Sequence, residues 1–187
     1  MKKSNPLKPG DNNLKGVGIW MTGLSGAGKT TISIFLEKRL IEMDYRVQRL
    51  DGDIVRQDLT ADLGFSKEDR DRNIQRVSFV AHLLVNQGIV VPCAFISPYW
   101  EERQYARDKI GRFIEVFVEC PLKVCEKRDV KGLYAKARAG EIKGFTGVDD
   151  PYEIPKNPEI VVHTDKMTLE DEVEIIIDYL KEHNYIV

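Results

Sequence analysis

Two short stretches of this sequence carry residue types that could bind a nucleotide and transfer a phosphoryl group. The first, GLSGAGKT at residues 23–30, matches the pattern G-x-x-x-x-G-K-[ST]. Glycines in this pattern let backbone N–H groups turn inward around phosphate oxygens, and the following helix adds partial positive charge. Lys29 would then bridge the β- and γ-phosphates, and the Thr30 hydroxyl would ligate Mg²⁺. We therefore predict a binding site for ATP and Mg²⁺ formed by Gly23, Leu24, Ser25, Gly26, Ala27, Gly28, Lys29, Thr30 and Thr31.

The second stretch, LDGDIVRQDL at residues 50–59, places two carboxylates on either side of one glycine. If a strand continues through it, the side chains of Asp51 and Asp53 point the same way. One carboxylate could then hold water on Mg²⁺ while the other orients an acceptor hydroxyl. A solvated polar turn is the alternative, and the position after the phosphate-binding loop favours a functional pair. The spacing does not decide which aspartate is the base.

Five short apolar runs predict the strands that position these stretches. Each is rich in β-branched and aromatic residues and is bounded by Gly, Pro or Asp. Helical spacing of apolar residues between the runs predicts intervening helices. The alternation predicts an α/β fold of the P-loop NTPase type, a parallel sheet with helices on both faces and ligands at the carboxyl ends of its strands. The predicted strands are residues 17–23, 45–51, 88–96, 113–120 and 159–165.

The length of 187 residues predicts one domain, residues 16–187, after a flexible lead at 1–15. Residues 129–158, rich in Gly, Pro and charge, predict a mobile lid. The net charge of -2 provides no overall field for binding nucleic acid. We also expect a cytoplasmic protein without membrane contact, because no stretch approaches the about 20 apolar residues that span a bilayer.

The cysteines and histidines do not form a recognisable metal or disulfide pattern. Cys93, Cys120 and Cys125 lie in or beside apolar runs, so we predict buried free thiols. The three histidines are scattered without ligand spacing, and a zinc site is not expected.

Four motifs, in order from about Lys15 to Asp165, resemble the adenylylsulfate kinase (APS kinase) family. They are GLSGAGKTT, LDGDIVRQDLTADLGFSKEDRDRNIQRV, FISPY and RDVKGLYAKARAGEIKGFTGVDDPYE. The resemblance implies transfer of the γ-phosphoryl group of ATP to the 3′-hydroxyl of adenosine 5′-phosphosulfate (APS). The products would be 3′-phosphoadenosine 5′-phosphosulfate (PAPS) and ADP, in sulfate activation. It also implies a homodimer and a functional link to ATP sulfurylase.

Three features depart from the family pattern. Ile54 stands where many members carry Asn, Trp100 and Glu101 replace a more usual basic pair, and the N-terminal lead is short. The first two leave the motif side chains intact, and the third puts regulation by an N-terminal segment in doubt. We expect the same reaction.

The resemblance also implies roles for individual residues. Phe65 and Phe145 would hold the adenine between them, and Arg56, Arg70 and Asn73 would contact APS, a guanidinium being well suited to its phosphosulfate. From the residues alone, core packing of each Phe and a solvated face for the charged helix would be favoured. Lys29, Asp51, Asp53 and Ser97 are the catalytic set, and Thr30 and Asp51 the metal-binding set. The full set for APS is Asp53, Arg56, Phe65, Arg70, Asn73, Ile96, Ser97, Lys131, Gly144 and Phe145.

Two residues have alternative interpretations. Ser97 could form a phosphorylated intermediate, but no neighbouring base is evident, so we favour a substrate contact and a helix N-cap with Pro98 at the first helical position. Arg128 could serve as an arginine finger or form a salt bridge. Lys131, with other basic residues of the lid, would bring positive charge to the transferring group when the lid closes.

Two other functions remain open at this point. A different small-molecule kinase would share the phosphate loop but has no reason to carry the lid motif. A non-catalytic nucleotide-binding partner should lack Lys29 or a catalytic carboxylate, and both are present.

Overall fold

The computed structural model describes residues 16–187, so the predicted flexible lead at 1–15 lies outside the described residues. Five parallel strands form one sheet in the order β2-β3-β1-β4-β5. This arrangement confirms the predicted parallel sheet. The strands are β1 Val17–Thr22, β2 Leu50–Asp51, β3 Val90–Ala94, β4 Phe113–Glu119 and β5 Ile160–His163.

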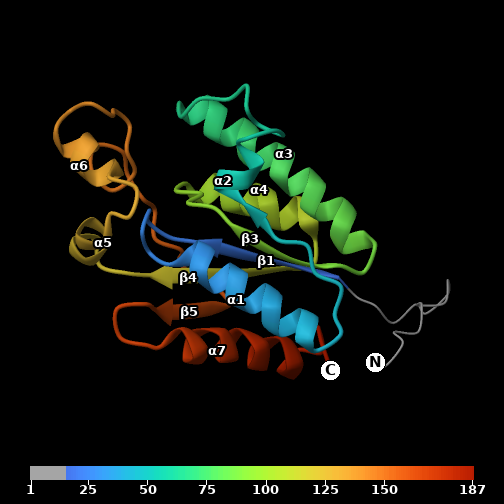
Figure 1. Ribbon diagram of the computed structural model, residues 1–187. Coiled ribbons are helices and arrows are strands. Elements are labelled where there is room, and N and C mark those ends of the chain that lie inside the picture. The colour runs from blue at the N-terminus through green and yellow to red at the C-terminus, as the bar shows by residue number, and fades with distance from the viewer. Residues whose placement is uncertain (1–15) are drawn as a thin grey trace.

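Helices cover both faces of the sheet, as predicted. Figure 1 shows α1 and α7 below the sheet and α3 and α4 above it, while α5 and α6 lie beyond the carboxyl ends of the strands. The helices are α1 Lys29–Glu42, α2 Gly52–Val55, α3 Lys67–Asn86, α4 Trp100–Ile110, α5 Leu122–Arg128, α6 Leu133–Arg138 and α7 Leu169–Glu182.

The central strand β1 is buried along its whole length. Val17, Ile19 and Met21 belong to the core on the α1 and α7 side, whereas Trp20 belongs to the core under α3 and α4. Successive side chains of a strand point to opposite faces, and both faces of a parallel sheet are covered. This explains why residues 17–21 are continuously apolar.

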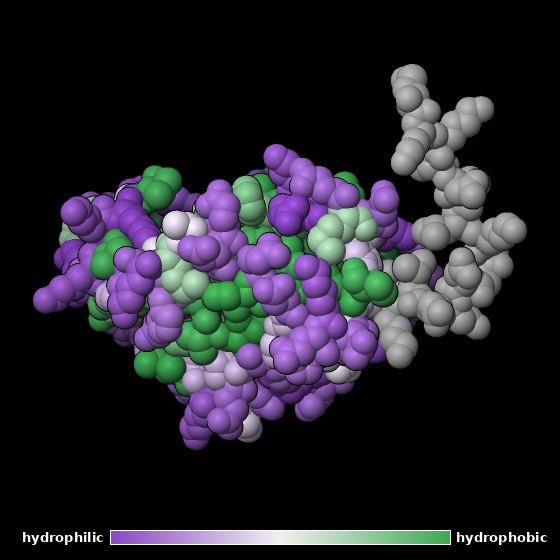
Figure 2. Space-filling view, turned by 90° about the horizontal axis from the view of Figure 1, so that it is seen from below, coloured by the Kyte–Doolittle hydropathy of each residue, from purple (hydrophilic) through white to green (hydrophobic). Residues whose placement is uncertain are grey.

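The outer surface on the α1 and α7 side is mixed. Figure 2 views the molecule from below and shows apolar side chains in the middle of this face, surrounded by hydrophilic ones. The elements here carry the exposed residues Ile34, Ile41 and Ile175. In the described part of the chain, no helix is long and apolar enough to cross a membrane.

The predicted strand at 45–51 is much shorter in the structure. Only Leu50 and Asp51 pair continuously, and Val47 makes one isolated bridge to Val90. The Asp51 carboxylate caps α2 by accepting a bond of 3.0 Å from the Asp53 backbone N–H. Because the chain turns into a helix at Gly52, Asp53 lies in the first turn of α2, and the prediction that a continuing strand aligns it with Asp51 is wrong.

The predicted start of the helix after Ser97 is also wrong. The N-cap of α4 is Tyr99, with extended backbone angles, and the first helical residue is Trp100. Ser97 is occupied elsewhere, because its hydroxyl accepts a hydrogen bond of 3.0 Å from Trp20 Nε1. By contrast, Thr168 is the N-cap of α7, its side chain accepting from the Asp171 backbone N–H at 3.2 Å.

Candidate active site

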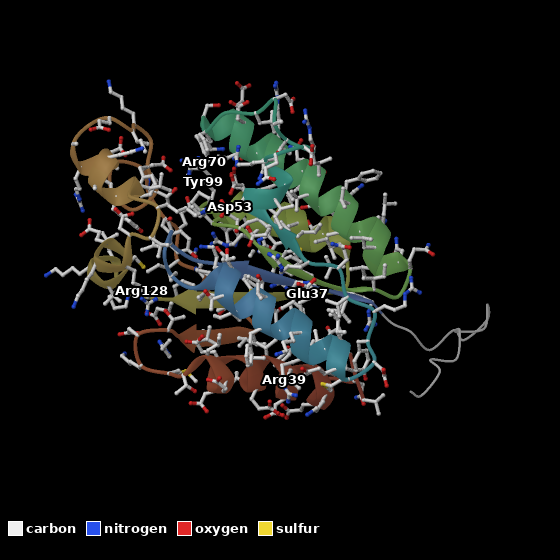
Figure 3. The ribbon with its side chains drawn as sticks, in the orientation of Figure 1. Glu37, Arg39, Asp53, Arg70, Tyr99 and Arg128 are labelled. Carbon is white, nitrogen blue, oxygen red and sulfur yellow. The ribbon has the colours of Figure 1, made fainter. Side chains whose placement is uncertain are left out.

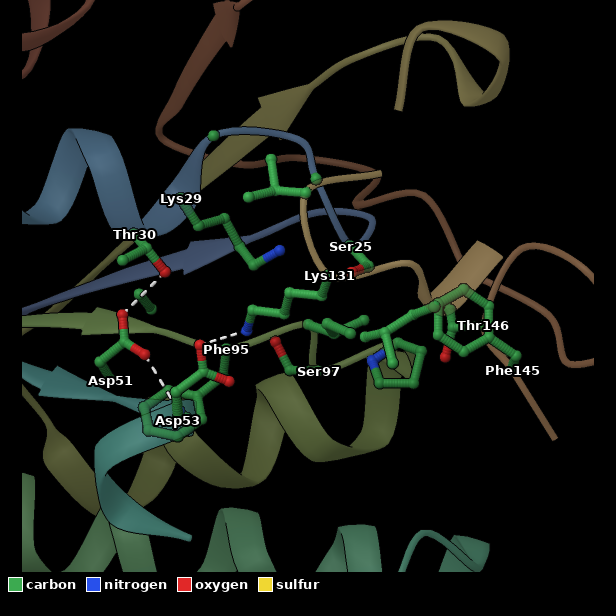
Figure 4. A pocket seen from close by; sticks show the side chains of 18 of the residues that line it. Ser25, Lys29, Thr30, Asp51, Asp53, Phe95, Ser97, Lys131, Phe145 and Thr146 are labelled. Atoms are coloured by element: carbon green, nitrogen blue, oxygen red, sulfur yellow. Dashed lines mark hydrogen bonds and ion pairs between the residues drawn. The ribbon is translucent and has the colours of Figure 1, made fainter. Parts of the chain in front are cut away.

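A large cavity of about 1130 Å³ lies at the carboxyl ends of the strands. Its wall includes the phosphate loop, the end of β2, α3, the turn after β3 and the lid segment, residues 129–158 (Figure 4). Most of the predicted site residues line it. They are Ser25, Gly26, Gly28, Lys29, Thr30, Thr31, Asp51, Asp53, Arg56, Phe65, Arg70, Asn73, Ile96, Ser97, Lys131 and Phe145.

Four predicted residues, Gly23, Leu24, Ala27 and Gly144, do not line the cavity. The carbonyls of Gly23 and Leu24 instead accept hydrogen bonds of 2.8 Å each from Lys29 Nζ. The Gly144 carbonyl accepts a hydrogen bond from the Arg70 guanidinium. Gly23, Leu24 and Gly144 therefore hold the side chains of Lys29 and Arg70, which do line the cavity.

The phosphate loop depends on glycine at two points. Gly28, the N-cap of α1, has φ of 109°, in the region that favours glycine. A Cβ on Gly23 would lie 2.5 Å from the Val118 carbonyl oxygen. Both observations account for glycine at the two ends of the turn that brings the N-terminus of α1 to the cavity.

Lys29 lies in this loop and is largely buried. Burial lowers the pKa of Lys29 to about 8, and the nearby charge of Lys131 acts in the same direction. The ammonium group is thus held beside the loop at a position where its charge is poorly solvated. An anionic ligand beside Lys29 would therefore stabilise its charged form.

The two residues predicted to bind the metal are in contact. Thr30 Oγ1 donates to Asp51 Oδ2 at 2.8 Å, and Asp51 is 3% exposed (Figure 4). Hydroxyl and carboxylate oxygens are suitable Mg²⁺ ligands, although Mg²⁺ sites of this kind draw most of their oxygens from phosphates and water. Consistent with that, no group of three or more His, Cys, Asp or Glu residues in residues 16–187 could hold a metal alone.

Asp53 has a different environment from Asp51. Its carboxylate is largely exposed, lines the cavity and forms an ion pair with Lys131 Nζ of the lid segment (Figure 4). The two aspartates therefore lie in different surroundings: Asp51 is buried beside the phosphate loop, and Asp53 is exposed to the cavity.

The aromatic residues Phe65 and Phe145 line the same cavity. Phe65 is 67% exposed, and the Arg56 guanidinium carbon lies 4.4 Å from its ring centroid. Phe145 is half-buried and meets Tyr134 edge-on, with centroids 5.0 Å apart. Core packing does not explain Phe65, because an exposed ring over a cavity contributes little to folding.

Arg70 and Asn73 are not on a solvated helix face. Arg70 donates to Thr146 Oγ1 at 2.6 Å and pairs with Asp150 at 3.3 Å, which joins α3 to the lid segment. Figure 3 shows Arg70 and Tyr99 in this region, and Tyr99 also donates to Asp150 at 2.9 Å. Asn73 is buried, and its Oδ1 accepts from the Thr60 hydroxyl at 2.8 Å.

The group bonded to Ser97 Oγ is the Trp20 indole N–H, which can donate but cannot take up a proton. The Ile96 carbonyl beside it accepts from Thr22 Oγ1 at 2.7 Å. This environment favours a binding role for the Ser97 turn over a nucleophilic one.

Arg128 also lines the cavity wall, and of its two alternative roles the salt bridge is not formed among the described residues. It donates to the Thr164 carbonyl at 2.6 Å and to Thr164 Oγ1 at 3.0 Å. Thr164 Oγ1 in turn donates to the Ala27 carbonyl at 2.8 Å. Arg128 and Thr164, which both line the cavity, thus hold the phosphate loop in place.

Sequence reasoning missed Thr164, Tyr134 and Glu102. Thr164 directly follows β5 and lies at the end of the predicted strand 159–165, so the rule for strand ends could have identified it. The Tyr134 hydroxyl donates to the Ser25 carbonyl at 2.9 Å, which docks α6 on the phosphate loop. Glu102 is buried in the cavity wall, and no pattern distinguishes it from an exposed glutamate in a helix.

The three cysteines are free and buried, as predicted. Burial raises the pKa of the Cys125 thiol to about 12, and burial likewise raises the pKa of Cys93. The Cys93 and Cys125 thiols are therefore protonated and unreactive at neutral pH.

The model of the adenylylsulphate kinase family matches residues 15–163 of this chain. The chain belongs to the adenylylsulphate kinase family. A curated adenylyl-sulfate kinase from Halothermothrix orenii is 63% identical over 174 residues, which cover 93% of this chain and 94% of that protein.

Solved structures in the adenylylsulphate kinase family share the fold. The Mycobacterium tuberculosis APS kinase in complex with AMPPNP and APS aligns with a TM-score of 0.87 and 45% identity, over 89% of this chain and 98% of that chain. The hexameric APS kinase from Thiobacillus denitrificans aligns with a TM-score of 0.70 and 33% identity, over 92% of this chain and 30% of that longer chain.

Proposed function

We propose that this chain is an adenylyl-sulfate kinase, which transfers the γ-phosphoryl group of ATP to the 3′-hydroxyl of APS and releases PAPS and ADP. Membership of the family and the identity to curated adenylyl-sulfate kinases support this activity. The observation that carries it is the single cavity that joins the phosphate loop to Asp53, Phe65 and Arg70.

ATP occupies the end of the cavity formed by residues 23–31. Lys29 contacts the β- and γ-phosphates, and the N-terminus of α1 supplies backbone N–H groups. The low pKa of Lys29 rises when phosphate binds, because the anion replaces the missing solvation of the ammonium group.

APS occupies the other end. Phe65 and Phe145 hold its adenine, while Arg56, Arg70 and Asn73 hold its anionic end and Ile96, Ser97, Gly144 and Lys131 complete the contacts. Stacking of a base on an aromatic ring contributes about 1 to 3 kcal/mol. This half of the site distinguishes APS from acceptors that lack an adenine or a phosphosulfate.

In the transfer step, Asp53 accepts the proton of the 3′-hydroxyl as that oxygen bonds to the γ-phosphorus. The bond between the γ-phosphorus and the bridging oxygen breaks, and ADP leaves. Lys29 and Lys131 stabilise the charge that spreads over the transferring group. We assign the proton to Asp53 rather than Asp51 because Asp51 is buried and already accepts two hydrogen bonds.

Mg²⁺ accompanies ATP in this proposal. Thr30 and Asp51 fit it through their hydroxyl and carboxylate oxygens, Asp51 acting directly or through water. When bound, Mg²⁺ neutralises charge on the phosphate oxygens.

We further propose that residues 16–187 act as one domain with residues 129–158 as its lid. A homodimer in the cytoplasm, with ATP sulfurylase as the functional source of APS, fits the family, although the relative from Thiobacillus denitrificans is described as hexameric.

The deciding experiment measures PAPS formation from APS and MgATP by the purified protein, beside parallel assays with a nucleoside monophosphate and with shikimate. We expect turnover in the assay with APS and none in the assays with the other two acceptors. No PAPS together with turnover of another acceptor would overturn the proposal.

Asp53→Asn tests the catalytic assignment. We expect turnover to collapse while calorimetry shows unchanged binding of AMPPNP. The matched control is Asp58→Asn, an exposed aspartate of the same segment that does not line the cavity. Near-normal turnover in the Asp53 variant would remove this residue from proton transfer.

A further inference from the structure

Arg103 of α4 is a buried cation that lies behind the acceptor half of the cavity. It is 1% exposed and does not line the cavity. Its guanidinium donates through Nη1 to the Ser97 carbonyl at 2.8 Å and through Nη2 to the Glu153 carbonyl at 2.7 Å. Its Nε forms an ion pair of 2.8 Å with Glu115 of β4. One side chain thus joins the turn after β3, the end of the lid segment and the sheet.

The Ser97 turn needs this support. Ser97 has φ of 38°, in the left-handed region that is unfavourable for a residue with a side chain. Such a conformation persists only where the surroundings fix it. Here the surroundings are Trp20 at the Ser97 hydroxyl, Thr22 at the Ile96 carbonyl and Arg103 at the Ser97 carbonyl.

The end of the lid segment is fastened to the same turn. The Glu153 backbone N–H donates to the Pro98 carbonyl at 2.8 Å, and the Glu153 carboxylate accepts from the Trp100 backbone N–H at 2.6 Å. The Tyr152 hydroxyl lies 2.9 Å from Thr22 Oγ1. Residues 152–153 are therefore tied to the Ser97 turn and to β1.

We infer that Arg103 is a positioning residue for the acceptor half of the site: it fixes the Ser97 turn and the end of the lid segment as one unit. This inference rests on the proposed function, because it assigns APS to that half. Arg103 touches neither substrate in this proposal, and it acts through the backbone of Ser97 and Glu153.

Glu115 holds Arg103 in place, and its second partner, Arg107, provides a matched control. Glu115 is buried and pairs with Arg103 at 2.8 Å and with Arg107 at 3.5 Å. Arg107 also pairs with Glu159 at 2.6 Å, but it makes no contact with the Ser97 turn among the residues described. Changing Arg107 therefore disturbs the same ion-pair network without disturbing the turn.

The first test compares Arg103→Lys with Arg107→Lys. A lysine ammonium cannot hold both carbonyls and Glu115 in the geometry of a guanidinium fork. We expect Arg103→Lys to raise the KM for APS about tenfold, because part of the binding energy of APS is then spent on ordering the loosened turn, with the KM for ATP within about twofold. Arg107→Lys should leave both KM values unchanged.

A double variant separates positioning from stability. Arg103→Met alone leaves the buried Glu115 with Arg107 as its remaining ion-pair partner and would lower the melting temperature. Arg103→Met combined with Glu115→Leu removes both buried charges. We expect the double variant to recover stability while its KM for APS stays raised. A double variant with a normal KM for APS would overturn the inference.

Hydrogen exchange provides a readout that does not depend on turnover. Arg103→Lys should speed exchange of the Glu153 and Trp100 amides, while Arg107→Lys should not. Equal effects of the two variants on exchange and on both KM values would reduce Arg103 to a structural residue and overturn the inference. If the wild-type protein makes no PAPS, the proposed function fails, and the exchange comparison alone then decides whether Arg103 fixes this unit.

Discussion

Glu102, in the first turn of α4, makes stability depend on pH in a direction opposite to that of a salt-bridged carboxylate. It is 4% exposed and separates the main cavity from a smaller one of about 210 Å³. Neither carboxylate oxygen makes a hydrogen bond of ordinary geometry with the described residues. Burial raises the pKa of Glu102 to about 7, and Asp71 adds to the rise, while the Tyr99 backbone and Arg70 oppose it.

The magnitude follows from the difference between the two states. A rise in pKa from 4.5 to about 7 corresponds to about 3 kcal/mol, at about 1.4 kcal/mol per unit. Below pH 4.5 both states hold the proton and Glu102 costs nothing. Between these values the folded state keeps a proton that the unfolded state has lost, so the free energy of unfolding falls as pH rises. The full cost is present above pH 7.

Glu102→Gln keeps the shape of the side chain and removes the charge. We expect the variant to gain stability over the wild type as pH rises, the difference growing by about 2 to 3 kcal/mol between pH 5 and pH 8. Urea unfolding at several pH values, with unchanged m-values, measures it. The control is Glu101→Gln, an exposed neighbour, which should show no such trend.

Two results would refute this reasoning about Glu102. A difference between variant and wild type that does not change with pH would mean that the carboxylate titrates normally. A variant less stable than the wild type at pH 8 would mean that the ionised carboxylate has a stabilising partner.

Other parts of the site and core support three further predictions. Affinity for AMPPNP should be nearly constant below pH 8 and fall up to about tenfold per unit above it, because the ammonium of Lys29 loses its proton with a pKa of about 8; calorimetry with a constant affinity to pH 9.5 would contradict this. Phe65→Leu should raise the KM for APS by about tenfold through lost stacking, with Phe79→Leu, an exposed residue that does not line the cavity, as control. Leu36→Ala should cost about 3 kcal/mol in urea unfolding because Leu36 is fully buried, against under about 1 kcal/mol for the exposed Ile34→Ala.

Local patterns in the sequence are sufficient to predict the sheet and the phosphate loop. Strand β1 is buried on both faces, so residues 17–21 are continuously apolar, and the glycine pattern at 23–30 encodes its own geometry. Strand ends of a parallel sheet meet at one edge, so the positions of Asp51 and Ser97 after apolar runs are enough to predict that both lie near the loop.

Tertiary packing decides the features that could not be predicted. Whether the chain continues as a strand or turns at Gly52 depends on the Asp51 carboxylate, which contacts Thr30 and caps α2 at the same time. Glu102 and Arg103 lie in a segment, SPYWEERQ, whose charge pattern is typical of an exposed helix. Arg103 is buried against Glu115 of β4 and against the end of the lid segment, where its partner Glu153 lies 50 residues away in sequence. Glu102 instead lies beside Asp71 and Ile74 of α3.

The contact between Trp20 and Ser97 gives the protein a built-in fluorescent reporter. The chain has two tryptophans, and the other, Trp100, is half-exposed at the surface. In a Trp100→Phe background all indole emission would come from Trp20, which stacks with Phe95 at 5.4 Å between ring centroids and donates to the Ser97 hydroxyl. Occupation of the acceptor half, but not of the nucleotide half, should then change the emission, so acceptor binding can be followed in the presence of nucleotide.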